Sequence, residues 1–311
     1  MVAAVFIALC LIWSSTWVVI VYATDGVPPC TSAAVRFWIA SALLMVVHLF
    51  RPIAFPRDWR TRLGILGLGV PHIGISYALV YWAEQHISSG LTAVVYLTYP
   101  CFVAAYSAWL FTQERWTAGK VAGLVFGIVG VCVVSFDENM VRGSVAIMGV
   151  LAALLSSAIS SFVVVAIKRW YAHHDSVAIT VLQLLAGAIT LTVFALLLEF
   201  DEKTDWKPRV VAATLYLAIF GSAIAFFGFY WLLKRVESTV ASMITFVFPP
   251  LAVGWGWLLK NEPVTKNLFV GGALVLIGVW LVVRASARAS AAKRVAGFDS
   301  PSPEPICQDG G

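Results

Sequence analysis

The chain has 311 residues, of which 60% are hydrophobic and only 12% are charged, and its mean hydropathy is +0.89. Charged residues make up about twice that share of an ordinary soluble domain, so the composition excludes that class. The net charge of +5 does not indicate nucleic-acid binding, because the basic residues fall in short loops between long apolar segments. Segments of about 20 apolar residues match the thickness of a bilayer and predict an all-α integral membrane protein.

The first half of the chain contains five predicted membrane spans. The first span lacks the basic leader of a cleaved signal peptide, so we expect it to be retained as a helix. The fifth carries Gly119, Gly123 and Gly127 at four-residue spacing, which lets helix backbones approach closely in lipid. The predicted spans are residues 2–22, 29–50, 63–83, 88–111 and 118–136.

The second half repeats the plan. Its five predicted spans are residues 144–167, 176–198, 210–233, 238–260 and 266–284. From residue 285 the chain turns to Ala, Ser, Lys, Arg, Pro and Gly and cannot bury a core, so 285–311 is predicted to be a disordered tail. We therefore expect one five-helix repeat over residues 1–137 and a second over residues 144–284.

Matched landmarks support the duplication. The Tyr-Trp pair at Tyr81 recurs at Tyr230, and Pro100 recurs as Pro249, both at an offset of 149 residues. After a one-residue gap the offset is 148 for the remaining pairs, which are Glu114 and Glu262, Gly123 and Gly271, and Gly130 and Gly278. A long repeat made of apolar segments is typical of a duplicated membrane bundle.

The basic residues also predict the orientation. If the N-terminus is cytoplasmic, fourteen of the 21 Lys and Arg fall in cytoplasmic loops and the tail, six fall outside, and Arg36 lies within a span. Cytoplasmic loops are enriched in Lys and Arg, so both termini are expected in the cytoplasm. Because each half has an odd number of helices, the second half would enter the membrane inverted. Inverted repeats let one bundle rock against the other around a central site.

Together these features resemble the EamA-type members of the drug/metabolite transporter (DMT) superfamily over nearly the whole chain. A Gly-rich helix follows the fourth span in the first half and the ninth span in the second half, as in that family. The residues that carry the resemblance are the mid-helix Pro100 and Pro249, the closing pairs Gln113-Glu114 and Asn261-Glu262, and Arg36-Phe37. The closing pairs depart from the usual Gly-Glu. The resemblance implies an inner-membrane, multi-pass carrier, commonly an exporter of amino acids or other small metabolites.

Arg36 and His72 lie well inside predicted spans, where ionisable groups are costly and therefore functional candidates. Arg36 could anchor a substrate carboxylate or form a gate pair with Glu84, which is expected to be solvated at the end of its span. The alternative is a structural arginine that caps backbone carbonyls. His72, beside Pro71, could couple protons. Its alternative is a neutral histidine bonded to a helix carbonyl.

The other candidates are aromatic and hydroxyl side chains. Trp13 and Trp17 share a helix face, and Tyr99 directly precedes the helix-breaking Pro100. Such a lining predicts an apolar cavity with hydroxyl donors, which suits a neutral or aromatic solute. For each residue the alternative is ordinary helix packing. The predicted substrate-binding residues are Trp13, Trp17, Arg36, His72, Tyr96, Tyr99, Ser160 and Phe246, and the predicted hinges are Pro100 and Pro249.

The sequence thus predicts a secondary transporter that exports small neutral or zwitterionic metabolites, such as amino acids, by alternating access. One alternative is a sugar-nucleotide or phosphorylated-sugar carrier, which would need several Lys or Arg in its cavity. Another is a multidrug efflux carrier, although residues 8–20 lack the first-span glutamate of the small multidrug members. A channel or an intramembrane enzyme fits less well, since the sequence shows no nucleophile motif or acid pair.

Few partners are expected. The five cysteines show no metal-ligand or redox spacing, so we expect no disulfide, no metal and no cofactor. The expected partners are a small-molecule solute and the lipid bilayer, with no nucleic acid. Proton coupling through His72 stays open, as does the choice between monomer and homodimer.

Overall fold

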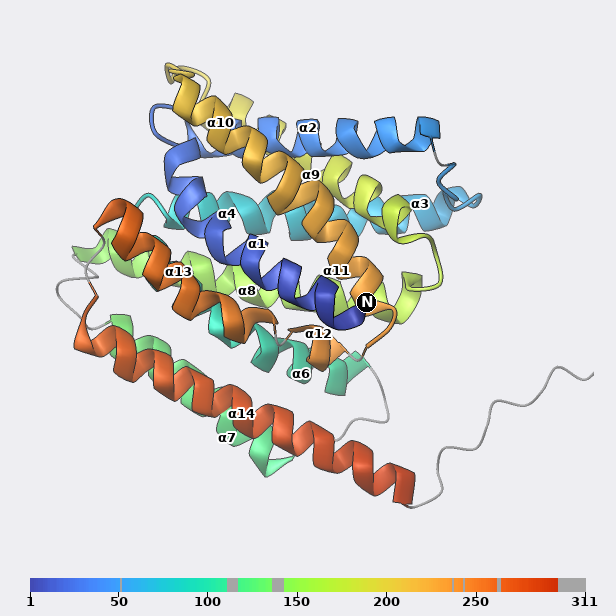
Figure 1. Cartoon of the computed structure of the whole chain (residues 1–311), viewed down its shortest axis with the longest axis vertical. Helices are drawn as coiled ribbons and strands as arrows, with labels where there is room; N and C mark the ends of the chain where they lie inside the picture. Colours follow the sequence, from blue (N-terminus) through green and yellow to red (C-terminus); the bar gives the residue numbers. More distant parts are fainter. Residues whose placement is uncertain are drawn as a thin grey trace, which may run out of the picture.

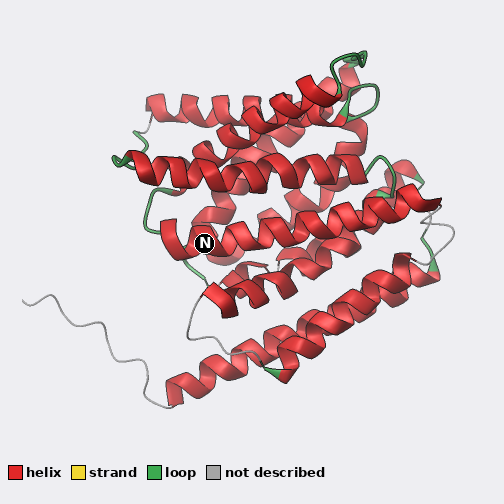
Figure 2. Cartoon of the chain, turned by 180° about the vertical axis from the view of Figure 1, so that it is seen from behind, coloured by secondary structure: helices red, strands yellow, loops and turns green. Residues whose placement is uncertain are grey.

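The computed structural model describes residues 1–50, 52–110, 117–135, 143–236, 238–242, 244–261 and 264–295. Within these ranges all regular structure is helical, and the helices form a layered bundle (Figures 1 and 2). The glutamates Glu114 and Glu262, on which the resemblance partly rests, lie outside the described residues.

Seven helices in the described part of the chain are long and apolar enough to cross a membrane. They cover Val2–Ala23, Pro29–Val47, Trp59–Ala83, Ser89–Leu110, Ser144–Tyr171, Ser176–Leu198 and Pro208–Leu233. The other three predicted spans correspond to α7 (Ala118–Ser135), to α12 (Ser238–Ser242) with α13 (Ile244–Lys260), and to α14 (Lys266–Val295). The finding supports a multi-pass membrane protein, while the ten-helix inverted repeat stays a prediction.

Four of the seven spans are single helices, namely α1 (Val2–Ala23), α2 (Pro29–Phe50), α8 (Gly143–Tyr171) and α9 (Ser176–Leu198). The other three are each broken near the middle. They consist of α3 (Trp59–Gly69), η1 (Val70–Ile75) and α4 (Ser76–Ala83); α5 (Ser89–Val95), η2 (Tyr96–Thr98) and α6 (Tyr99–Leu110); and α10 (Pro208–Tyr216), η3 (Leu217–Ile224) and α11 (Ala225–Leu233).

The two breaks η1 and η3 are π-helical and η2 is a 3-10 turn. The π-helical segments begin 147 residues apart and end 149 apart, so they occupy the same place in the two halves of the sequence. π-Helical turns are rare and occur frequently at functional sites. The matching π-helical segments make the middle of the third and eighth predicted spans candidate parts of a functional site.

Acidic and hydroxyl side chains cap several helix starts. Asp58 accepts hydrogen bonds from the backbone N–H groups of Arg60 and Thr61, and the Thr61 bond lowers the pKa of that carboxyl. Asp175 caps α9 in the same way. The start of α2 is capped from a distance, because the Glu199 carboxylate accepts the backbone N–H groups of Cys30 at 2.7 Å and of Thr31 at 2.8 Å. This cap ties α2 to the end of α9.

The helices pack in pairs that match between the halves. α2 lies against α9, α1 against α13 and the α10–α11 helix, and α8 against α6 and α4. α7 and α14 form a separate pair along the lower edge of Figure 1. Elements from both halves therefore surround the centre of the bundle.

Glycines bring α7 and α14 into backbone contact, which confirms the close approach predicted from their spacing. A Cβ atom on Gly278 would lie 2.4 Å from the Gly123 carbonyl oxygen and 2.9 Å from the Gly127 nitrogen. A Cβ on Gly119 would lie 2.9 Å from the Cβ of Ala285. Position 278 therefore accepts only glycine, because any larger residue would meet the backbone of α7.

Two sequence-based expectations differ from the structure. Glu84 was expected to be solvated, but it is only 7% exposed, because the first turns of α8 cover the end of α4 around Ala83 and Ile87. The last helix runs on to Val295, past residue 285 where the tail was expected to begin. Alanine is the strongest helix former and is frequent in that stretch. Residues 296–311 lie outside the described part.

Candidate functional site

A cavity of about 100 Å³ lies at the centre of the bundle. A space of roughly 10–15 Å³ holds one water, so this cavity has room for a small solute. It is walled by helices of both halves. The lining residues are Trp13, Thr16, Trp17, Ile20, Arg36, His72, Tyr77, Val80, Tyr96, Tyr99, Ser160, Val164, Phe226, Phe229, Ala241, Ser242, Ile244 and Thr245.

Seven of the eight predicted substrate-binding residues line this one cavity. The exception is Phe246, whose backbone lies in α13 and whose side chain is outside the described residues. The predicted hinge Pro100 is buried at the start of α6, directly after η2, so the helix is interrupted beside it. Pro249 lies within α13, where its side chain is not described.

One wall of the cavity is aromatic. The Trp13 ring lies 6.0 Å from that of Phe226 and 5.3 Å from that of Phe229, measured between centroids. Trp17 contacts Tyr96 edge-on at 4.9 Å. The Trp13 Nε1 donates to the Gly221 carbonyl at 3.4 Å, which fixes the indole against η3. This wall presents flat apolar faces to a solute.

Ser160 and Tyr96, which line the cavity, belong to a cluster of hydroxyl groups. Ser76 Oγ lies 2.6 Å from Ser160 Oγ and also bonds Ser156, which in turn bonds the Tyr96 hydroxyl. The chain of hydroxyls joins α4, α8 and η2. Ser76 and Ser156 were missed from the sequence, although Ser156 and Ser160 lie four residues apart on one helix face and gave a usable signal.

Arg36 is buried, with 1% of its surface exposed. Its Nε donates to Ser222 Oγ at 2.8 Å, and its two terminal nitrogens donate to the Tyr81 hydroxyl at 3.1 Å and the Gly221 carbonyl at 3.3 Å. The guanidinium also lies 5.2 Å from the centroid of the Tyr77 ring. Arg36 thus links α2 to η3, across the two halves.

No carboxylate of the described residues forms an ion pair with Arg36, so the predicted gate pair with Glu84 is not formed. A buried cation without a counter-charge is costly. The bonds above use three of the five guanidinium N–H donors, and the Tyr77 hydroxyl is a further hydrogen-bond partner, so at most two donors remain for another acceptor.

His72 makes its contacts with neutral groups. Its Nδ1 lies 3.1 Å from Gln183 Oε1 and 3.3 Å from the Tyr230 hydroxyl. Gln183 Nε2 donates to the Ile65 carbonyl at 2.6 Å, which orients the amide so that its oxygen accepts from Nδ1. The other ring nitrogen, Nε2, is then an acceptor, and it has no partner in the described part of the chain.

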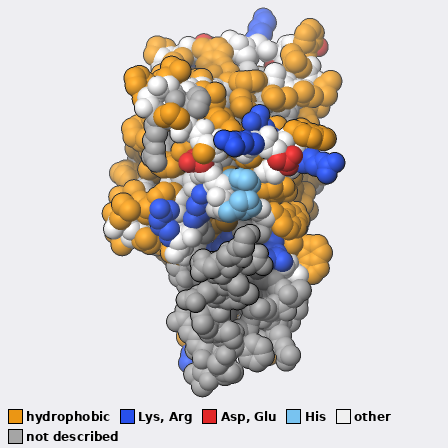
Figure 3. All heavy atoms as spheres, turned by 90° about the vertical axis from the view of Figure 1, so that its right-hand side faces the viewer, with side chains coloured by type: hydrophobic (Ala, Val, Ile, Leu, Met, Phe, Trp, Pro, Cys, Tyr) orange, Lys and Arg blue, Asp and Glu red, His pale blue; other side chains and the backbone are white. Residues whose placement is uncertain are grey.

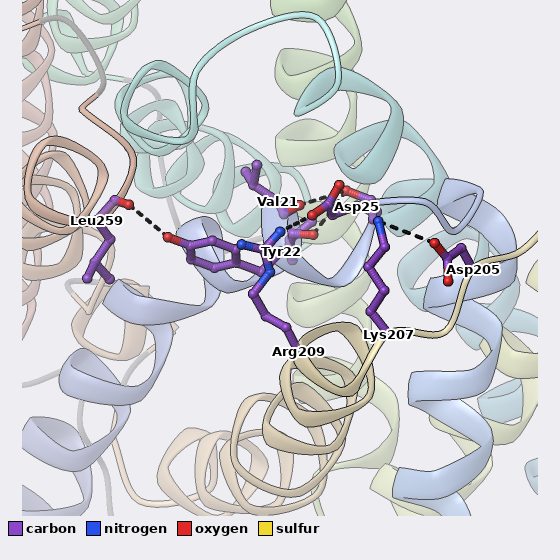
Figure 4. A network of polar contacts seen from close by, with 9 residues as sticks. Val21, Tyr22, Asp25, Asp205, Lys207, Arg209 and Leu259 are labelled. Atoms are coloured by element: carbon purple, nitrogen blue, oxygen red, sulfur yellow. Dashed lines mark hydrogen bonds and ion pairs between the residues drawn. The ribbon is translucent and has the colours of Figure 1, made fainter.

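One end of the bundle is tied together around Tyr22 (Figure 4). Arg209, at the start of α10, forms an ion pair with Asp25 and lies over the Tyr22 ring. The Tyr22 hydroxyl donates to the Leu259 carbonyl at 2.8 Å, at the end of α13, and Lys260 Nζ lies 4.9 Å from the ring centroid. These contacts join the ends of α1, α10 and α13 at one side of the cavity.

The opposite end carries basic side chains and a pair of histidines (Figure 3). Lys168 Nζ donates to the Val236 carbonyl at 2.5 Å and Lys234 bonds the His174 carbonyl, so the loops after α8 and α11 are joined. The rings of His173 and His174 are 3.9 Å apart. This is the end that the sequence predicts to be cytoplasmic.

Comparison with known proteins identifies the family. The model of the EamA-like transporter family matches residues 1–136 and 147–284. The chain is 25% identical to a Bacillus subtilis protein described as the uncharacterized transporter YoaV, over 88% of this chain and 94% of that one. It is 27% identical to the uncharacterized inner membrane transporter YedA of Escherichia coli K12, over 88% of each chain.

Further matches agree. The Salmonella typhimurium protein PagO is 21% identical over 91% of this chain and 92% of its own length. A solved structure described only as the crystal structure of a protein superposes with a TM-score of 0.70, at 20% identity, over 92% of this chain and 98% of that chain, which shows a shared fold. With both halves matched by the family model, the chain belongs to the EamA-like transporter family and is a multi-pass membrane transporter of the DMT type.

Proposed function

We propose that the protein is a secondary transporter that exports small neutral or zwitterionic metabolites, amino acids foremost, through the central cavity. The observation that carries this proposal is Arg36, a buried cation with no described counter-charge on the wall of an otherwise uncharged cavity. One carboxylate balances that charge, and a second net charge on the solute would be left unpaired. A zwitterion or a neutral molecule therefore suits the site.

The remaining groups complement an amino acid. Its carboxylate would use the remaining N–H donors of Arg36. Its ammonium would donate to His72 Nε2 or to the hydroxyl of Ser160, both of which line the cavity. An apolar or aromatic body would pack against Trp13 and Trp17. Proton coupling has less support, because His72 already contacts neutral partners.

We further propose alternating access by two inverted repeats, with both termini in the cytoplasm. The matched π-helical segments η1 and η3 and the matched helix pairs favour a duplicated bundle. Arg36 crosses between the halves, so their relative motion would change the site. The contacts around Tyr22 would form the gate on the outer side, and Pro100 and Pro249 would act as hinges.

Solute exchange tests the proposal. Purified protein is reconstituted into proteoliposomes loaded with one unlabelled solute from a panel of amino acids, amines, alcohols and phosphorylated sugars, and uptake of its labelled form is followed. We expect saturable exchange of zwitterionic amino acids and none of phosphorylated sugars. Exchange of phosphorylated sugars or dications alone would overturn the assignment.

A further inference from the structure

A second cavity lies between the fourth span and the helices α13 and α14. Its volume is about 580 Å³, which is within the roughly 300–1,000 Å³ of small-molecule sites. Every lining residue is apolar or glycine, and the side chains that define it include Val94, Leu97, Val253, Trp257, Leu268 and Leu276. Water gains no hydrogen-bond partner from such side chains, so they favour an apolar occupant.

Two glycines keep this cavity open. A Cβ atom on Gly254 or on Gly272 would meet no atom within 4 Å. Gly278, on the same helix as Gly272, behaves differently, because its Cβ would collide with the backbone of α7. The small residues at 254 and 272 thus leave space instead of allowing helix contact.

The position of the cavity indicates its occupant. Trp257 and Phe269 line it and are 60% and 67% exposed, so its mouth faces the surroundings of the bundle, which in a membrane are lipid chains. Lys266, in the first turn of α14, is exposed and has no partner among the described residues. A cation at the end of an apolar groove matches an anionic headgroup above its acyl chain.

We propose that this cavity binds one acyl chain of an anionic phospholipid, with the phosphate beside Lys266. The chain would pack against Leu97, which belongs to the turn η2. The neighbouring Tyr96 and Tyr99 line the central cavity instead. A bound lipid therefore supports the back of the wall that faces the solute.

Photo-crosslinking tests the proposal on the full-length protein in nanodiscs. The probe is phosphatidylglycerol with a diazirine on its acyl chain, and labelled peptides are identified by mass spectrometry. We expect label on residues 94–97, 253–257 and 268–276. Gly272→Phe fills the cavity and should remove this label. The control is Gly67→Phe on α3, whose added Cβ also meets no atom within 4 Å, and it should keep the label.

Lys266→Gln gives a second measurement that does not depend on filling the cavity. It should lower labelling by phosphatidylglycerol roughly fivefold and leave labelling by the matched phosphatidylcholine probe unchanged. Label spread evenly over the exposed helices, and unchanged in Gly272→Phe, would overturn the proposal.

Discussion

Replacing Arg36 with glutamine separates a solute-binding role from a structural one. Glutamine keeps a hydrogen-bonding side chain near Ser222 and Gly221 but removes the buried charge. A hydrogen bond to a charged group contributes about 1.5–3 kcal/mol. Losing one such bond to a carboxylate should therefore weaken the affinity for amino acids roughly 10- to 150-fold.

Solutes without a carboxylate should respond differently. An uncharged alcohol of similar size makes no ion pair with Arg36, so its transport should change by less than about threefold, which corresponds to losing a neutral hydrogen bond of about 0.5 kcal/mol. The assay is counterflow of both solutes in the same proteoliposomes. Ser222→Ala is the matched control, because it removes the Nε partner at 2.8 Å while the charge stays.

The ratio between the two solutes decides the question. A selective loss for amino acids in Arg36→Gln, absent in Ser222→Ala, supports carboxylate binding. Equal losses for both solutes would refute the reasoning and assign Arg36 to holding α2 against η3.

Three other perturbations test the moving parts and the packing. Pro100→Ala with Pro249→Ala should keep solute binding but slow exchange, because each restores a backbone donor that the hinge lacks; wild-type exchange by the double variant would show that the prolines are only tolerated. Tyr22→Phe removes the bond to the Leu259 carbonyl, so an impermeant thiol reagent should label a cysteine at Ile20 roughly fivefold faster, and unchanged labelling would count against the gate. Gly278→Leu should lower the free energy of unfolding by about 1–3 kcal/mol, because its Cβ would lie 2.4 Å from the Gly123 carbonyl oxygen. The loss should appear as a lower melting temperature, and an unchanged melting temperature would contradict the close crossing.

Much of the helix layout and of the site could be predicted from the sequence. Apolar run length located the spans, and the repeat indicated which of them meet at the centre. Seven predicted residues consequently line one cavity. Trp13 and Trp17 were accessible to this reasoning because a four-residue spacing places them on one helix face.

What the sequence missed depends on contacts between distant segments. Arg36 bonds Ser222, 186 positions away, and His72 bonds Gln183, 111 positions away. Helical periodicity carries no information about such pairs. Phe226 and Phe229 were missed because they follow a π-helical segment, which changes the face that later residues present. Glu84 was placed wrongly because the first turns of α8, which are distant in the sequence, pack over the end of α4.

The most direct test of the central claim is to fill the cavity that both halves line. Ser160→Trp puts a large side chain into the space beside Trp17 and Tyr96, while Leu155→Trp changes a 53% exposed residue on the same helix. Amino-acid counterflow is measured for both variants after each is shown to purify as a monodisperse protein. The account predicts that Ser160→Trp abolishes exchange and that Leu155→Trp exchanges like the wild type. Wild-type exchange by Ser160→Trp would contradict transport through this cavity.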